Sequence, residues 1–231
     1  MNRFVLFIGL IAISLNTFSQ KTAEERVGAW YMHFGNYKVA KNWSLFTEYH
    51  LRMYDPVGKW QQMIGSVGIT RHFNNNTKAG LGYAYLPTES FEKGAAKKTA
   101  QEHRIWQTYF LNNQMGRLAI RHRYQLEERF LSTSTGNSAY KTRIRYQLML
   151  TLPLNNDKKV DKTFYLIAAN EFFLHLEQKP FDQNRFIVGA GYKVNEWADL
   201  QFGYMRQSFN TFSYDRLMLS WTINPDFTKK Q

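Results

Sequence analysis

The chain of 231 residues contains no cysteine, five prolines and only 18 Asp and Glu against 30 Lys and Arg. Without cysteine there can be no disulfide framework, thiolate nucleophile, thiolate metal site or lipid-modified cysteine. Five Pro and 14 Gly are too few for a collagen-like or low-complexity chain. A chain with 44% hydrophobic residues is not a disordered tail. The net charge of +12 favours an anionic partner.

The sequence has one long hydrophobic run, Phe4–Leu15, and it lies at the start of the chain. A short segment with the positive charge of Arg3 precedes the run, and the small residues Thr17 and Ser19 follow it. This is the layout of a cleavable secretory signal. The run is shorter than the roughly 20 apolar residues that a membrane-spanning helix needs. We therefore expect a signal peptide over residues 1–19 and a single domain over residues 20–231.

Polar and apolar residues alternate strictly over residues 143–152. One set is Arg143, Arg145, Gln147, Met149 and Thr151, and the other is Ile144, Tyr146, Leu148, Leu150 and Leu152. A period of two indicates a β-strand with one polar and one apolar face. Residues 43–53 and 118–130 show the same alternation.

The pattern recurs along the chain and predicts eleven strands. They cover residues 27–38, 42–54, 61–73, 77–86, 102–112, 117–130, 140–152, 163–174, 184–193, 199–208 and 214–223. Most are long enough for a tilted strand to cross a bilayer, which takes about 9–11 residues. The connections alternate between short and long, with Pro87–Gln101 and Leu131–Ala139 among the long ones.

This organisation predicts an all-β fold, an antiparallel up-and-down transmembrane β-barrel of about 10–12 strands in the outer membrane. Bacterial single-chain barrels have an even number of strands, so we expect ten or twelve rather than eleven. The expected surroundings are outer-membrane lipid and lipopolysaccharide. The alternative is a soluble sandwich or calycin-like barrel, in which the apolar faces would point inward.

Several motifs, taken in order, resemble a family of small outer-membrane barrels of Gram-negative bacteria that is known only as a domain of unknown function. They are Gly28-Ala29-Trp30, Glu48 with Arg52, Glu102-His103-Arg104-Ile105-Trp106, Arg121–Arg129, Arg143–Tyr146, Glu171, Asn184-Arg185 and Gly189–Tyr192. The resemblance implies a barrel fold and residence in the outer membrane. It implies no activity and no catalytic residues.

Ten side chains of the polar faces fall beside the long connections. They are Glu48, His50, Arg52, Glu102, Arg104, Glu127, Arg129, Arg143, Glu171 and Arg185. We expect them to form a charged ring inside one mouth of the barrel. They either fill the lumen with salt bridges, since a narrow barrel packs its interior with side chains, or form a selectivity ring or site for a small anion.

Evidence for catalysis is weak. Ser44, Ser66 and Ser220 lie on the polar faces, whereas His103 and His122 lie on the apolar ones, so no nucleophile and base are aligned. No His and acid spacing suits a metal, no glycine-rich loop suits a phosphate cofactor, and no helix suits a nucleic-acid groove. We predict no enzyme, no cofactor and no nucleic-acid partner.

The predicted function is a structural or narrow-channel role, with a cationic, salt-bridged lumen. One alternative is a surface-loop protein that binds an anionic ligand or lipopolysaccharide, for which the basic run Lys93–Lys98 is the candidate contact. A weaker alternative is a lipid-modifying barrel hydrolase.

Overall fold

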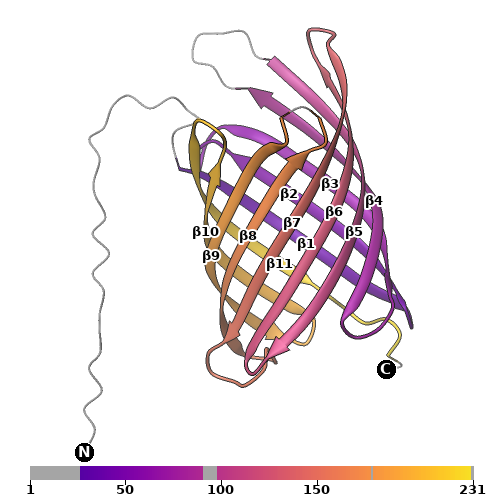
Figure 1. Cartoon of the computed structure of the whole chain (residues 1–231). Coiled ribbons are helices and arrows are strands. Elements are labelled where there is room, and N and C mark those ends of the chain that lie inside the picture. The colour runs from indigo at the N-terminus through magenta and orange to yellow at the C-terminus, as the bar shows by residue number, and fades with distance from the viewer. Residues whose placement is uncertain (1–26, 91–97, 178, 230–231) are drawn as a thin grey trace, which may run out of the picture.

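The computed structural model describes residues 27–90, 98–177 and 179–229, which form a closed barrel of eleven tilted strands (Figure 1). The predicted signal peptide, residues 1–19, lies outside the described residues. The strands are β1 Gly28–Ala40, β2 Trp43–Met53, β3 Trp60–His72, β4 Thr77–Ser90, β5 Lys98–Met115, β6 Leu118–Thr133, β7 Ser138–Pro153, β8 Thr163–His175, β9 Phe181–Asn195, β10 Ala198–Ser208 and β11 Ser213–Ile223.

The strand count is odd, so the expectation of ten or twelve strands is wrong. Every strand is antiparallel to its sequence neighbours, and the barrel closes where β1 pairs with β11 in parallel, from Gly28 opposite Arg216 to Gly35 opposite Ile223. When an odd number of strands alternate in direction, the first and the last run the same way. They pair in parallel, and a parallel ladder still satisfies their backbone groups. As a result, β1 starts at one end of the barrel and β11 finishes at the opposite end (Figure 1).

The segment after β11 extends this seam. The Lys38 amide donates to the Pro225 carbonyl and the Phe227 amide donates to the Lys38 carbonyl, both at 3.0 Å. The ammonium of Lys38 also pairs with the Asp226 carboxylate at 3.0 Å. These contacts fasten the end of the chain to β1, beyond the last residue of the β1–β11 ladder.

Two hairpins are longer than the alternation predicts. The β4–β5 ladder continues to Ser90 opposite Lys98, so the predicted loop Pro87–Gln101 is wrong over residues 87–90 and 98–101, which belong to the strands. The β6–β7 ladder continues to Ser132 opposite Ser138, which shortens the predicted loop Leu131–Ala139. The hydrogen bonds of a ladder need only the backbone, whereas the sequence predicts a strand from alternating polar and apolar side chains. That alternation is weak in these polar stretches. Residues 91–97, with most of the basic run, lie outside the described part of the chain.

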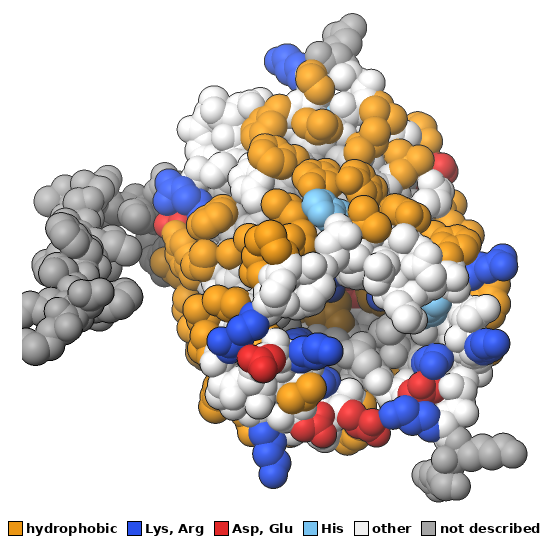
Figure 2. All heavy atoms as spheres, turned by 60° about the horizontal axis from the view of Figure 1, so that its bottom comes forward, with side chains coloured by type: hydrophobic (Ala, Val, Ile, Leu, Met, Phe, Trp, Pro, Cys, Tyr) orange, Lys and Arg blue, Asp and Glu red, His pale blue; other side chains and the backbone are white. Residues whose placement is uncertain are grey.

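The two faces of each strand meet different surroundings. Large apolar side chains point outward, for example Ile69, Phe164 and Phe202, which are 51%, 57% and 59% exposed. Figure 2 shows such hydrophobic side chains over the outer wall. The polar faces turn inward, where Thr108 and Gln147 are buried. No helix within the described residues is long and apolar enough to cross a membrane.

An aromatic side chain spans part of the lumen, and glycines make room for it. The Trp106 ring lies over Gly68 and Gly82, where an added Cβ would clash with it. The Trp106 indole nitrogen donates to the Ser66 hydroxyl at 2.9 Å, which fixes the ring inside the barrel. A small apolar cluster of Ile64, Ala84, Leu86 and Trp106 thus occupies part of the β3–β5 wall, and β5 also carries the buried charges of Glu102 and Arg104.

Candidate functional site in the lumen

A cavity of about 1040 Å³ runs along the inside of the barrel and is lined by side chains from all eleven strands. It reaches from Gln62 and Thr88, near the long connections, to Arg117 and Asn224, near the short turns. Thirteen Lys and Arg line it, against four Asp and Glu. Figure 2 views the barrel from the short-turn end and shows a hollow with charged side chains around it. The lumen is therefore incompletely filled and strongly cationic.

A buried carboxylate, Glu127, is shared by three arginines. It pairs with Arg104 at 3.1 Å, with Arg143 at 2.6 Å and with Arg145 at 2.6 Å, and its side chain has no exposure to solvent. These residues come from β5, β6 and β7, whose inward faces adjoin in the sheet. A buried carboxylate is tolerated only when charge and hydrogen bonds compensate it, and here the three guanidinium groups do so.

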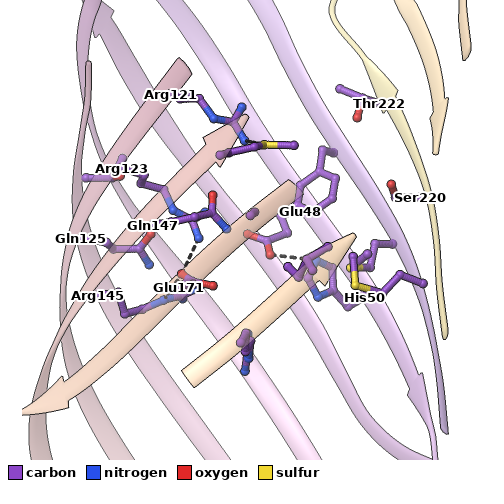
Figure 3. A pocket seen from close by; sticks show the side chains of 18 of the residues that line it. Glu48, His50, Arg121, Arg123, Gln125, Arg145, Gln147, Glu171, Ser220 and Thr222 are labelled. Atoms are coloured by element: carbon purple, nitrogen blue, oxygen red, sulfur yellow. Dashed lines mark hydrogen bonds and ion pairs between the residues drawn. The ribbon is translucent and has the colours of Figure 1, made fainter. Parts of the chain in front are cut away.

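The network continues on both sides of Glu127. Glu102 pairs with Arg104 at 2.6 Å and with Arg129 at 2.8 Å. On the other side, Glu171 pairs with Arg123 at 2.6 Å and with Arg145 at 2.7 Å. Figure 3 shows the Arg123–Glu171 pair inside the barrel. This wall therefore holds paired charges that pack part of the interior.

Three members of this network were not among the ten predicted residues. Arg123 and Arg145 lie on the polar faces but far from the loops, and Asp182, which pairs with Arg143 at 2.7 Å, precedes the predicted start of its strand. The stagger of neighbouring strands brings these residues level with the others; Arg145, for example, lies opposite Gln125 and Phe173. The polar alternation already places both arginines on the lumenal faces, but the predicted ring is limited to residues beside the long connections.

The predicted residues fall into two groups. Glu102, Arg104, Glu127, Arg129, Arg143 and Glu171 belong to the network, whereas Glu48, His50, Arg52 and Arg185 lie outside its ion pairs. In the second group, Glu48 pairs with His50 at 2.9 Å (Figure 3). Arg52 donates to the Gln62 side-chain oxygen at 2.7 Å.

Two guanidinium groups of the second group lie against the same indole. The Cζ atom of Arg52 is 3.7 Å from the centre of the Trp30 ring, and that of Arg185 is 4.9 Å from it. Arg185 also lies 4.4 Å from the centre of the Phe173 ring. Cation–π contacts of this kind hold a guanidinium in place without neutralising its charge.

Lysines face the cavity at the short-turn end. The connection over residues 154–162 places Lys158 and Lys159 along the cavity, and Lys159 pairs with Asp199 at 2.7 Å. Burial lowers the pKa of Lys159, and the Asp199 carboxylate opposes that shift. This end of the lumen thus carries positive charge too.

The serines and histidines form no catalytic triad within the described residues. The Ser44 hydroxyl lies 2.8 Å from the His72 Nε2 atom, a pair that the sequence reasoning missed, but no described carboxylate contacts His72. His103 bonds to the hydroxyl of Tyr83 on the outer face instead. Across the described ranges, no group of three or more His, Asp or Glu is placed to hold a metal ion. The absence of enzymatic activity stays a prediction.

Comparison with known proteins identifies a family without assigning an activity. No curated protein matches the chain, and no solved structure matches it. A family model described as protein of unknown function (DUF2490) matches residues 27–218, which include every strand except the last part of β11. This match confirms the resemblance to a family of unknown function. The chain therefore belongs to the DUF2490 family.

Proposed function

We propose that this protein is an outer-membrane β-barrel with a narrow channel that prefers anions. The observation that carries the proposal is the cavity itself, which extends along the lumen with thirteen basic and four acidic side chains on its wall. The connection between β4 and β5 covers residues 91–97 rather than the predicted Pro87–Gln101. Fewer residues are therefore available to form a binding surface on this loop. For that reason we favour the lumen over the loops as the functional site.

The outer surface supports residence in a membrane. Its strands have 11 to 18 residues, against the roughly 9–11 that a tilted transmembrane strand needs. Large apolar side chains on the outside, such as Leu81, Phe186 and Leu200, are 48–52% exposed. Burying a side chain of this size in lipid is worth about 1.5–3 kcal/mol. A belt of them, with the polar residues turned inward, suits a lipid bilayer better than water.

The charge imbalance supports a preference for anions. The network on β5–β9 is close to neutral, with five arginines and four carboxylates joined in ion pairs. The excess comes from other lining residues, including Arg117, Arg121 and Lys158. Excess positive charge along a narrow channel, whose walls have a low dielectric constant, attracts anions and repels cations.

Cell fractionation tests the membrane part. We expect the protein in the outer-membrane fraction, and we expect a change of gel mobility on boiling, because closed barrels resist unfolding in detergent. Recovery from the soluble periplasm without detergent would contradict membrane residence.

Planar-bilayer recording tests the channel part. Wild-type protein should give small currents whose reversal potential in a KCl gradient favours chloride. Arg121→Glu should shift that potential toward cations, because the Arg121 guanidinium lines the cavity and its polar contact is the Met149 sulfur rather than a carboxylate. Arg206→Glu is the control, since Arg206 is exposed and does not line the cavity. Silence of the wild type would overturn the channel and leave a packed structural barrel.

A further inference from the structure

Arg185 is a buried cation that contacts aromatic rings but has no hydrogen-bond or ion-pair partner among the described residues. It is 9% exposed, it forms no hydrogen bond or ion pair with another described residue, and its Nε atom is buried without an acceptor. Glu171 acts on Arg185 through its charge, but the carboxylate of Glu171 is engaged by Arg123 and Arg145. A buried charge that lacks hydrogen-bonded compensation is costly and rare in folded proteins.

Arg52 and Trp30 add to this deficit of acceptors. The Nε atom of Arg52 and the indole Nε1 atom of Trp30 are buried without a hydrogen-bond partner. No described carboxylate pairs directly with Arg52, whose contacts are Gln62 at 2.7 Å and His50 at 3.5 Å. The positive charges of Arg52 and Arg185 also act on each other. Three buried donors around one indole therefore lack an acceptor.

The wall of the cavity supplies the location. Trp30, Arg52 and Arg185 all line the lumen. The Nε and Nε1 atoms of these residues are buried, so the atoms of Arg185 that a solute can reach are its two Nη groups, which form no hydrogen bond within the described residues. The Arg185 Cζ atom lies 4.9 Å from the centre of the Trp30 ring and 4.4 Å from the centre of the Phe173 ring, and these two contacts restrict the guanidinium. A guanidinium fixed in this way is preorganised for a planar, bidentate contact with an oxyanion.

We propose that Trp30, Arg52 and Arg185 form a binding site for a small, freely diffusing oxyanion, a carboxylate or a phosphate. This inference rests on the proposed channel for access, and it deepens that proposal by naming the site and the class of solute. The ligand supplies acceptor oxygens to the Arg185 Nη groups, and its negative charge relieves the repulsion between the Arg52 and Arg185 guanidinium groups. The arginines of the neighbouring network do not bind it, because carboxylates of the protein already occupy them.

Calorimetric titration of the folded protein in lipid-free detergent with inorganic phosphate tests the site. Wild-type protein should bind phosphate with saturation at one site. Arg185→Gln and Arg52→Gln should each lower the affinity about tenfold or more, since the first removes charge-assisted hydrogen bonds to the ligand and the second removes a neighbouring positive charge. Arg206→Gln is the matched control, because Arg206 is exposed, pairs with Asp215 at 3.4 Å and does not line the cavity.

A stability measurement guards against misfolding. Removing an unpaired buried charge relieves repulsion, so Arg185→Gln should keep the gel mobility shift on boiling at the wild-type temperature or above. If Arg185→Gln has also lost this shift, its loss of phosphate binding reports misfolding. In that case Arg52→Gln, assayed in the same way, decides whether binding depends on the guanidinium groups.

The outcomes separate this site from the channel. Absence of phosphate binding by the wild type, or equal binding by both variants, would overturn the site even if anion currents are observed. Phosphate binding that depends on Arg185 in a protein without conductance would support the site and overturn the channel. A parallel titration with phospholipid vesicles distinguishes the source of the phosphate: binding to the vesicles that depends on Arg185, without binding of the free ion, would contradict the freely diffusing ligand.

Discussion

Glu127 and Arg143 lie directly opposite each other on β6 and β7, and one carboxylate oxygen of Glu127 accepts from both Nε and Nη2 of Arg143, at 2.8 and 2.6 Å. The other oxygen accepts from Arg104 and Arg145. One carboxylate without solvent exposure thus holds three arginines from neighbouring strands. This arrangement explains how a wall rich in arginine can pack inside a narrow barrel.

We expect Glu127→Gln to lower stability strongly. The substitution removes the negative charge that compensates three buried arginines, and breaking a buried pair of this kind costs about 3–5 kcal/mol. The temperature at which the gel mobility shifts on heating should fall. Glu128→Gln is the control, because Glu128 lies on the other face of β6 and forms no ion pair with a described residue. Equal transitions for wild type and Glu127→Gln would show that the network does not hold the barrel together.

Gly82→Ala should destabilise the barrel more than Gly65→Ala. A Cβ at Gly82 would lie 2.5 Å from the Val67 carbonyl oxygen and would also clash with the Trp106 ring, whereas a Cβ at Gly65 would have no neighbour within 4 Å. Overpacking of this kind costs about 1–3 kcal/mol. Urea titration of the two variants in detergent measures the difference. A Gly82 variant as stable as the Gly65 variant would mean that the Trp106 wall is loosely packed.

The seam should lose one contribution to stability in acid. Hydrogen bonds from Thr228 and Lys38 lower the pKa of Asp226 from its ordinary 3.8 to about 2. Because the pKa is lower in the folded state, the contribution is present above pH 3.8 and is lost as the pH falls through about 2. Asp226→Asn should therefore melt below wild type at neutral pH, and the gap should close toward pH 2.

Thermal melts across that pH range test the seam, with Asp157→Asn as the control. Asp157 has a side chain that is 95% exposed, and its contact with Arg117 spans 3.8 Å. A gap between wild type and Asp226→Asn that stays constant with pH would show that the carboxylate does not act through its charge.

A protease site inserted at Gly136 should be cleaved on intact cells, and one inserted at Asn75 should be protected. Gly136 lies in the β6–β7 connection, at the end where every connection has at least four residues, and Asn75 lies in the β3–β4 turn at the opposite end, where every connection except residues 154–162 has at most four (Figure 1). Outer-membrane barrels expose their longer loops outside the cell. The reverse pattern would place the mouth with the long connections toward the periplasm.

Local alternation was enough to predict an all-β barrel, the approximate position of each strand and the face on which each side chain lies, but not that an odd number of strands closes the barrel. Strand pleating alternates side chains between two sides, so a stretch such as residues 143–152 records its two faces directly in the order of its residues. The same alternation predicted that Arg104 and Glu127 face the inside of the barrel, without information about which residues of other strands they contact.

The tertiary structure decided closure and partnership, which depend on strands far apart in the chain. The parallel β1–β11 seam arises only when the sheet closes, and no local pattern distinguishes it from an antiparallel one. The stagger between strands decides that Arg145 meets Glu127 and Glu171, while Arg185 meets two aromatic rings. Both arginines have the same alternation in the sequence, and only the register of their neighbours leaves Arg145 in ion pairs with carboxylates and Arg185 without an ion pair among the described residues.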